Sequence, residues 1–374
     1  MPNRTGAAGM KFPSYISNYV AMPKRDIIVV GASAGGVSAL RSFVSSLPPD
    51  FKGSIFVVLH IPPYAETRLA GILSAAGPLK AVQPRDGEEI KGGMIYVAAN
   101  DHHLLLENSK VIVKKGPKEN RFRPSIDALF RSAAYVYGPR VIGIVLSGLL
   151  NDGTSGLWSI KRMGGITIIQ EPDDAEYPQM PENVLEYVAV DYTIPAAEIG
   201  PLLVKLTDET APKKSKVPIE ELRLLEMEVT IATRDNAFEM GIMSYGELTP
   251  FTCPDCHGSL ARLVEGDLIR FRCHTGHAYT ANALLADLTQ SVEDMLWQSM
   301  RGMEEMNLLL LNIEKHLRGL GHRKQATLFN VKAEEAAHRA RIIHDSIFKQ
   351  EQYSEDIRFQ EGDLKKAAQK RKKK

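Results

Sequence analysis

DIIVVGASAGGVSAL, residues 26–40, decides the fold, because it reads as a strand, a glycine turn and a helix in direct succession. The run DIIVVG is apolar without alternation and rich in β-branched residues, which is typical of a strand buried on both faces of a sheet. The turn after it holds one serine, Ser33, among Gly31, Gly35 and Gly36. Such a turn suits a nucleophile, a phosphate-binding loop or plain packing, and this stretch alone leaves the three open.

The same alternation of short β-branched runs and helical segments continues to about residue 206. It predicts an α/β domain with a doubly wound, mostly parallel sheet and helices on both faces. Residues 94–115 look different, because Asn, Ser and Lys join their two runs, and we expect an antiparallel hairpin there. The predicted strands are DIIVVG, SIFVVLH, MIYVAA, KVIVKK, VIGIVLSG and ITIIQ, and two predicted helices are GGVSALRSFVSSL and SIDALFRSAAYVYG.

Composition limits the class of protein. The chain has 374 residues, too many for one ordinary core, and 44% of them are hydrophobic, so we expect two or three domains. Its 46 basic and 45 acidic residues give a net charge of +1, which does not favour nucleic acid as a partner. The sequence has no apolar signal region and no apolar run of about 18 residues. We therefore expect a cytoplasmic protein without a membrane span.

Three of the predicted strands end in chemically useful side chains: Ser33, His60 and Asp152. In an open parallel sheet, reactive groups gather at the carboxyl ends of the strands. If these strands are neighbours, a hydroxyl, an imidazole and a carboxylate meet, which is the set needed for acyl transfer. The backbone amides near Ala34 and Leu149 are then expected to face the developing oxyanion.

Each residue of this set also has a purely structural interpretation. Ser33 suits a helix cap, the Asn-Asp-Gly around Asp152 suits a turn, and His60 suits a buried histidine with satisfied hydrogen bonds. A dinucleotide fold would need G-x-G-x-x-G, which the spacing of the glycines does not give. GASAG does match the G-x-S-x-G elbow of α/β-hydrolases, but those enzymes place the acid before the histidine. The coincidence of three strand ends favours the catalytic set.

Several motifs, in the same order, resemble the catalytic domain of the chemotaxis protein-glutamate methylesterases of the CheB type. They are VVGASAGGVSAL, VVLHIP, NRFRPSIDALF and VLSGLLNDGTSGL, and the resemblance covers residues 26–206. It implies that Ser33 is the nucleophile, His60 the general base and Asp152 its partner, with an oxyanion site at the backbone of Ala34 and Leu149. It also implies a carboxylic ester hydrolase that removes glutamate γ-methyl esters from a helical chemoreceptor region, with glutamine deamidation in some members.

The sequence departs from the family pattern at three positions near these motifs. Ala34 replaces the usual threonine, Phe122 stands where histidine is frequent, and Leu149 where methionine is frequent. None of these changes removes a member of the triad, but the first two alter the pocket and with it the substrate preference. Only 25 residues precede residue 26, so we expect no receiver domain and a different input for regulation. The alternative function is a non-enzymatic signalling adaptor that keeps the fold and binds a partner through its C-terminal helices.

The chain's three cysteines lie together, in CPDCHGSLARLVEGDLIRFRCHTGH. Cys253 and Cys256 form a C-x-x-C pair, and Cys273 and His277 follow at the spacing of a structural zinc site. Four protein ligands close such a site, so we expect one structural Zn²⁺ in a small ribbon and no cofactor for catalysis. Between the two ligand pairs, LARLVEGDLIRFR predicts a hairpin that turns at residues 265–267.

The fourth zinc ligand is open to three histidines. His277 is preferred because of its spacing and because similar extensions of methylesterase-like proteins read C-x-x-G-H-A. His274 and His257 are the alternatives.

The region after the ribbon is predicted to be a helical hairpin broken at Gly319 and Gly321. Its Met-rich apolar stripe packs within the hairpin, binds a helical partner or forms a homodimer. The stripe consists of Leu288, Val292, Met295, Ser299, Met303, Met306, Leu310, Ile313 and Leu317. The predicted parts are an N-terminal extension (1–25), the catalytic domain (26–206), a linker and helix (207–247), the zinc ribbon (248–280), the hairpin (281–350) and a basic tail (351–374).

Overall fold

The computed structural model describes residues 24–61, 68–214, 216–233 and 240–349. The predicted basic tail and nearly all of the predicted N-terminal extension lie outside these residues. The described N-terminal half is an α/β domain built on a seven-stranded sheet in which every pair of neighbouring strands is parallel. In spatial order its strands are β10 (Tyr192–Ile194), β9 (Ile166–Gln170), β8 (Val141–Val145), β1 (Ile27–Ala32), β2 (Ser54–Leu59), β5 (Met94–Val97) and β3 (Lys80–Val82).

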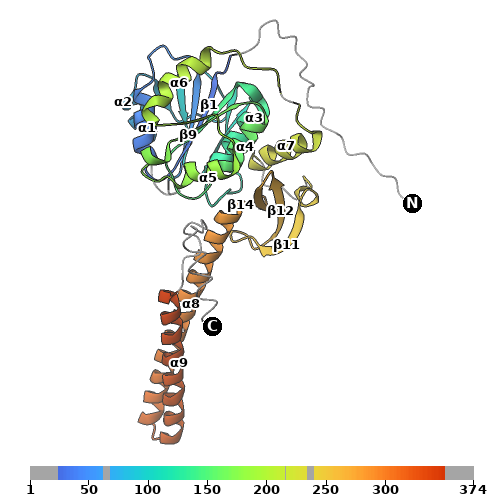
Figure 1. Cartoon of the computed structure of the whole chain (residues 1–374). Helices are drawn as coiled ribbons and strands as arrows, with labels where there is room; N and C mark the ends of the chain where they lie inside the picture. Colours follow the sequence, from blue (N-terminus) through green and yellow to red (C-terminus); the bar gives the residue numbers. More distant parts are fainter. Residues whose placement is uncertain (1–23, 62–67, 215, 234–239, 350–374) are drawn as a thin grey trace, which may run out of the picture.

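Helices cover both faces of this sheet, as predicted for a doubly wound fold (Figure 1). One face carries α1 (Gly36–Ser45), α2 (Leu69–Ala76) and α6 (Ala196–Asp208). The other face carries α3 (Ile126–Tyr137), α4 (Thr154–Arg162) and α5 (Gln179–Tyr187). Strand β1 is buried along its whole length because successive side chains alternate between the two cores. The apolar runs without alternation are thus explained.

The chain order of the strands reverses between β1 and β8. From β1 the chain continues to β2, then to the edge strand β3, and then to β5, which lies between β2 and β3; it returns to the other side of β1 with β8, β9 and β10. In open α/β sheets, such a switch point opens a crevice at the carboxyl ends of the strands. The ends of β1, β2 and β8 meet there.

The predicted hairpin over residues 94–115 is right only for its second part. Strands β6 (His103–Glu107) and β7 (Lys110–Lys114) are antiparallel and turn at Asn108 and Ser109, and β4 (Glu88–Glu89) pairs with β7. The first run, β5, instead lies between β2 and β3 in the parallel sheet. The Asn-Ser turn is a local signal that the sequence carries, whereas the sheet that β5 joins depends on distant strands.

A C-terminal extension, residues 219–349, follows the α/β domain. Helix α7 (Ile219–Thr233) packs on α3, and an antiparallel sheet comes next, formed by β11 (Glu247–Thr252), β12 (Ser259–Glu265), β13 (Leu268–Cys273) and β14 (Ala278–Thr280). Glu265 pairs with Leu268, so the predicted hairpin turns at Gly266 and Asp267, and Gly266 has φ +61°. Short 3₁₀ helices occupy Gly138–Arg140, Pro172–Asp174 and Ile242–Ser244.

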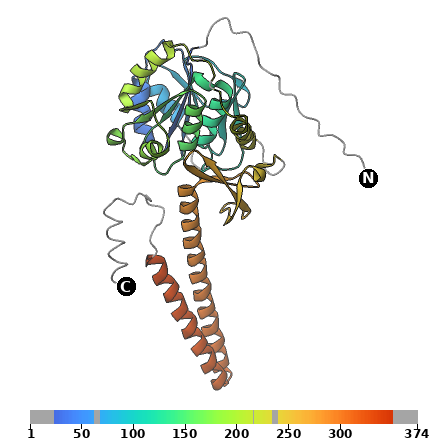
Figure 2. The same cartoon turned by 45° about the vertical axis from the view of Figure 1, so that its right-hand side comes forward.

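The extension ends in an arm of two long helices, α8 (Ala281–Gly319) and α9 (Arg323–Lys349), which projects away from the α/β domain (Figures 1 and 2). The helix α9 buries Ala326, Ala333, Ala340 and Ile347, seven residues apart, so small side chains let the two helices approach closely. None of the described helices is long and apolar enough to cross a membrane.

The predicted single stripe of α8 is divided between two faces. Met303, Leu310 and Leu317 are half-buried, whereas Val292, Met295 and Met306 of the same stripe are exposed. An ideal helix drifts by about 20° per seven residues relative to a strict heptad, so spacing alone does not say which apolar side chains one partner covers.

Charged side chains join the α/β domain and the extension through a buried ionic network. Arg272 of β13 donates to Glu119 at 2.9 Å and to Glu228 of α7 at 3.0 Å. Arg131 of α3 also pairs with Glu119, and Arg270 of β13 pairs with Glu228 at 2.9 Å. All five side chains are at most 2% exposed. Because each charge has a partner of opposite sign, the network is satisfied only while the extension is docked.

Candidate active site

Ser33 and His60 stand side by side at the ends of neighbouring strands. In the register of β1 and β2, Ala32 pairs with Leu59, the residues directly before Ser33 and His60. The backbone amide of His60 donates to the carbonyl of Ala32 at 3.1 Å. Strand β8 flanks β1 on its other side, and the loop after it carries Asp152. The three strand ends that the sequence singled out are therefore adjacent, as the catalytic interpretation requires.

His60 and Asp152 form a buried pair. One ring nitrogen of His60, Nε2, lies 2.8 Å from Oδ2 of Asp152, and the two side chains are 2% and 1% exposed. The other ring nitrogen, Nδ1, is buried and has no hydrogen-bond partner within the described residues. A histidine with one nitrogen held by a carboxylate and the other unpaired is arranged to accept a proton from a neighbouring hydroxyl.

Asp152 is held as an anion by the start of α3. Its Oδ2 accepts from the amide of Ile126 at 2.7 Å, and its Oδ1 accepts from the Ser125 hydroxyl at 3.0 Å and the Asn120 side-chain amide at 2.9 Å. Burial alone would raise the pKa of Asp152, but the hydrogen bond and charge of His60, together with Asn120 and the Ile126 amide, hold this pKa well below its usual range. The carboxylate therefore stays ionised and fixes the imidazole.

Sequence reasoning missed a second buried carboxyl group, Asp127, in the first turn of α3. Its Oδ1 accepts from the amides of Gly153 and Gly156 at the start of α4, at 3.0 and 2.6 Å. Burial and the nearby charge of Asp152 raise the pKa of Asp127 to about 8. An acidic residue in a first helical turn is a signal for the start of a helix, and the sequence does show it here. Nothing in the neighbouring residues indicates that Asp127 accepts hydrogen bonds from the start of α4 as well.

The turn around Ser33 is shaped by close backbone contacts. The Ser33 amide donates to the carbonyl of Ser147 at 2.9 Å. A Cβ on Gly148 would lie 2.9 Å from the Cβ of Ser33, so only glycine fits beside the serine there. Gly35 has φ +70°, and a Cβ on it would lie 2.7 Å from Oγ of Ser147. Both glycines are thus required by the approach of the β8 loop to the serine turn.

The two predicted oxyanion amides are available for a ligand. In the described part of the chain, the backbone amides of Ala34 and Leu149 donate to no protein acceptor. The Leu149 side chain is 45% exposed, and the next residue, Leu150, has φ +63°. The Ala34 carbonyl accepts from the Ser147 hydroxyl at 2.8 Å, which fixes the orientation of the peptide that follows it. Free amides beside a strand end suit a developing oxyanion.

Phe122, one of the departures from the family pattern, lies directly on the imidazole. Its ring stacks on His60 with centroids 3.7 Å apart and an angle of 7° between the planes. This contact covers one face of the imidazole with an apolar ring. The substitution therefore acts on the candidate base itself, and the pocket is affected through that contact.

The four predicted zinc ligands gather in the ribbon. The ligating atoms of Cys253, Cys256, Cys273 and His277 all lie within 4.8 Å of one another. Cys256 Sγ and Cys273 Sγ are 3.6 Å apart, and His277 Nδ1 is 3.6 Å from both Cys253 Sγ and Cys273 Sγ. Edges of about 3.7 Å belong to a tetrahedron with metal–sulfur bonds of about 2.3 Å, so the set fits zinc. His257 is outside this group, and so is His274.

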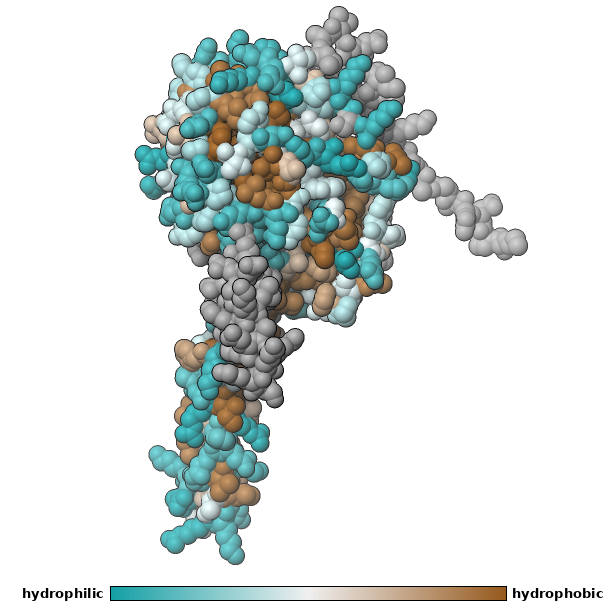
Figure 3. Space-filling model, in the orientation of Figure 1, coloured by the Kyte–Doolittle hydropathy of each residue, from teal (hydrophilic) through white to brown (hydrophobic). Residues whose placement is uncertain are grey.

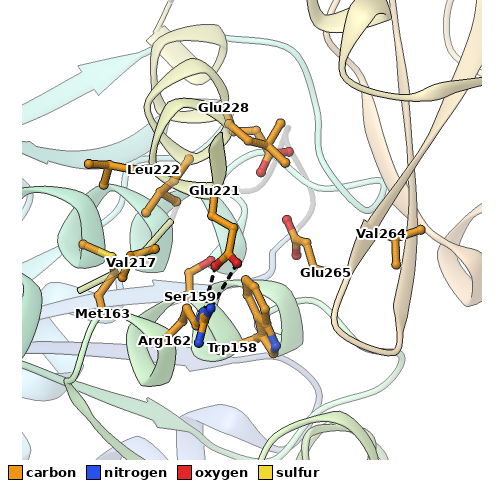
Figure 4. Close-up of a pocket in the computed structure, with 12 residues that line it drawn as sticks. Trp158, Ser159, Arg162, Met163, Val217, Glu221, Leu222, Glu228, Val264 and Glu265 are labelled. Carbon is orange, nitrogen blue, oxygen red and sulfur yellow. Dashed lines mark hydrogen bonds and ion pairs between the residues drawn. The ribbon is translucent and has the colours of Figure 1, made fainter. Parts of the chain in front are cut away.

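A small cavity of about 50 Å³ lies away from the candidate site, between α4, α7 and the β12–β13 hairpin (Figure 4). Arg162 of α4 and Glu221 of α7 form a two-pronged ion pair at its edge, at 2.7 and 3.0 Å. Glu228 of the buried ionic network also lines it, as does Glu265, which pairs with Arg270 of that network. The cavity is thus a seam of the contact between the α/β domain and the extension, and it is too small for a protein substrate.

The α/β domain is the part of the chain that matches a known protein family. The family described as CheB methylesterase matches residues 28–203. A relative from Leptospira interrogans, whose name places it among the protein-glutamate methylesterase/protein-glutamine glutaminases, is 38% identical over 182 residues, 48% of this chain and 94% of the relative. The chain belongs to the CheB methylesterase family.

A further relative and a solved structure match about half of this chain. The Thermotoga maritima protein-glutamate methylesterase/protein-glutamine glutaminase is 36% identical over 184 residues, and the match spans 48% of this chain and about half, 54%, of that protein. The crystal structure of the Thermotoga maritima CheB methylesterase catalytic domain is 35% identical and covers 49% of this chain and 98% of that chain, with a TM-score of 0.47. The C-terminal extension lies outside the family match.

Proposed function

We propose that this protein is a serine esterase that hydrolyses glutamate γ-methyl esters on a signalling protein, with chemoreceptors as the expected class of substrate. The observation that carries the proposal is the buried His60–Asp152 pair, whose second ring nitrogen is unpaired, beside Ser33 at the switch point of the sheet. Membership of the CheB methylesterase family supports the same reaction. The relatives are also named protein-glutamine glutaminases, which supports glutamine deamidation as a second proposed reaction of the same site.

The proposed reaction has two halves. Ser33 Oγ attacks the ester carbonyl carbon while His60 takes its proton, and the amides of Ala34 and Leu149 bind the oxyanion. When the bond to the methoxy oxygen breaks, His60 returns the proton to that oxygen and methanol leaves. Water then attacks the acyl-serine, and His60 carries its proton to Ser33 Oγ, so that glutamate and free serine result. Asp152 stays ionised and stabilises the imidazolium in both halves.

A fluorophosphonate probe distinguishes the esterase from the alternative, a non-enzymatic adaptor. The esterase is labelled at Ser33, as read by peptide mass spectrometry, and His60→Ala abolishes the labelling. Ser45→Ala is the matched control and should be labelled like wild type, because this exposed serine at the end of α1 donates only to the Ser42 carbonyl, at 2.9 Å. The esterase also releases methanol from methylated receptor fragments, and Ser33→Ala does not. A folded wild-type protein that the probe leaves unlabelled would refute the esterase.

We also propose one structural Zn²⁺ in the ribbon, held by Cys253, Cys256, Cys273 and His277. The tetrahedral spacing of the four ligating atoms supports it, and four protein ligands leave no open position for chemistry. Metal analysis should give about one zinc per chain. His277→Ala should lose the metal, whereas His274→Ala, in the same ribbon but outside the cluster, should keep it. Equal zinc content in the two variants would contradict this ligand set.

The exposed face of α8 leads us to propose a homodimer through residues 281–350. Val292, Met295, Met306 and Leu309 are exposed there, and Figure 3 shows apolar patches along the arm. With Ser299 and Gly302 between them, these positions are spaced three, four, three, four and three residues apart, so they read the same from either end. A second α8 running antiparallel thus places Val292 against Leu309 and Met295 against Met306, which is a self-complementary contact.

Light scattering on the purified protein tests the dimer. We expect a dimer at micromolar concentration and a monomer for Met306→Glu. Leu328→Glu on α9 is the matched control, because Leu328 is 56% exposed but does not belong to this face of α8. A monomeric wild type, or a dimer in all three proteins, would reject this face as the interface. The cytoplasmic location stays a prediction from the sequence.

A further inference from the structure

We propose that the C-terminal extension positions the catalytic pair, through the loop formed by residues 118–122, and is thereby a required part of the esterase. The inference rests on the proposed function, because it concerns the same site. It assigns Asn120 and Thr280 as positioning residues. The family match ends at residue 203, so Thr280 lies outside the part of the chain that matches the family.

The outer side of the 118–122 loop is attached to the extension by backbone hydrogen bonds. The Asn120 amide donates to the carbonyl of Ala278 in β14 at 2.7 Å, and the Ala278 amide donates to the carbonyl of Lys118 at 3.2 Å. The Thr280 amide donates to the side-chain oxygen of Asn120 at 2.8 Å. The loop therefore lies along β14 as an added edge, and the extension determines which way the Asn120 side chain points.

The inner side of the same loop contacts both members of the catalytic pair. The Asn120 side-chain nitrogen donates to Oδ1 of Asp152 at 2.9 Å and to Oδ2 of Asp127 at 2.8 Å. Two residues later, Phe122 stacks on His60. Asn120 is buried and its amide has only one orientation in which the nitrogen faces two carboxyl groups and the oxygen faces the Thr280 amide. If the Asn120 amide group were rotated by half a turn, its oxygen would face the two carboxyl groups, and an oxygen cannot donate a hydrogen bond to them.

Thr280 makes a second connection, directly to the loop that carries the acid. Its hydroxyl donates to the side-chain oxygen of Asn151 at 2.6 Å, one residue before Asp152. The Thr280 hydroxyl oxygen also accepts from the Ala283 amide at 3.2 Å and so caps α8. Thr280 is fully buried. One hydroxyl group of the extension thus both caps α8 and holds the loop of the catalytic acid.

The backbone of the 118–122 loop needs this support. Asn120 has φ +50° and Arg121 has φ +77°, the left-handed region that costs a non-glycine residue free energy unless its surroundings hold it. Arg121 reaches into the extension as well, since its Nε pairs with Asp287 of α8. Contacts that hold a strained loop also decide where its side chains lie. A displacement of β14 or of the start of α8 therefore changes the support of His60 and Asp152 together.

Labelling kinetics with a fluorophosphonate test the inference on the full-length protein. Thr280→Val removes the hydroxyl and Thr280→Ser keeps it. We expect Thr280→Val to lower the maximal rate of Ser33 labelling about tenfold with little change in the probe concentration for half-maximal rate, and Thr280→Ser to restore the rate to within about twofold of wild type. Asn151→Ala removes the acceptor of the same hydrogen bond without touching the cap of α8, and should slow labelling likewise.

A matched control separates positioning from general weakening of the contact between the two parts. Glu221→Gln breaks the ion pair between α7 and α4, which joins the same two parts away from the 118–122 loop. It should leave the labelling rate within about twofold of wild type. The inference is overturned if Thr280→Val and Asn151→Ala, both folded, label as fast as wild type, or if Glu221→Gln slows labelling as much as they do. An unlabelled wild type would instead refute the proposed function itself.

Discussion

Asp152 caps α3, the helix that carries Asp127, and Asp127 caps α4, the helix that follows Asp152. Asp152, in the loop before α4, accepts from the first amides of α3, and Asp127, in the first turn of α3, accepts from the amides that begin α4. The positive ends of two packed helices thus meet two buried carboxyl groups. This exchange fixes the candidate catalytic acid to both helices.

Asp127 should make stability fall as pH rises. Its pKa is raised from 3.8 to about 8 in the folded protein, so its stabilising contribution is complete below pH 3.8 and is lost as pH rises toward 8. In Asp127→Asn, which cannot ionise, this part of the decline should be absent. Urea denaturation from pH 4 to pH 8 measures it. Identical pH dependence in the two proteins would show that the pKa of Asp127 is not raised.

Removing the Asp127 side chain should cost more than neutralising it. Asp127→Ala leaves the amides of Gly153 and Gly156 without their acceptor, and we expect a loss of about 2–3 kcal/mol in the free energy of unfolding. Asp127→Asn retains an acceptor oxygen and should lose less. A smaller loss in the alanine variant than in the asparagine variant would contradict the capping role.

Glu119 should connect stability to the docking of the extension. Burial would raise its pKa, but Arg131 and Arg272 lower it to about 2, so its contribution is present above pH 4.5 and is lost as pH falls toward 2. Glu119→Gln leaves both arginines short of a charge and should cost about 3–5 kcal/mol at pH 7. Glu220→Gln is the matched control: it breaks an exposed pair with Arg223 and should cost less than about 1 kcal/mol. Comparable losses in the two variants would argue against a buried network.

Phe122 should support the imidazole through its ring. Phe122→Ala removes the stacked face and should slow labelling of Ser33 several-fold, whereas Phe122→His keeps a planar ring over His60 and should slow it less. The rate of fluorophosphonate labelling measures both. If the alanine variant is labelled as fast as wild type, stacking does not position His60.

Gly148 should be irreplaceable beside the candidate nucleophile. In Gly148→Ala the new methyl group would lie 2.9 Å from the Cβ of Ser33, so the serine turn must shift and labelling should fall at least tenfold. Gly71→Ala, at a helical glycine with open space around it, should leave labelling unchanged and raise stability by about 0.5–1 kcal/mol. Unchanged labelling in Gly148→Ala would mean that the turn tolerates displacement.

The sequence by itself determined the elements and the chemistry at their ends. Runs of β-branched residues without alternation indicate buried strands, and Ser33, His60 and Asp152 lie where such runs end. The spacing of the cysteines likewise predicted which four side chains gather in the ribbon. These signals are local: each is carried by residues within one strand, one turn or one short motif.

Only the tertiary structure decided what supports those residues. Asn120 and Asp127 lie 32 and 25 residues from Asp152 along the chain, and Thr280 lies 160 residues from Asn120, so no periodicity joins them. The same holds for the face of α8 that α9 covers and for the partners of the buried arginines. Hydrogen bonds between distant segments depend on how whole elements pack, and a local pattern of residues does not specify that packing.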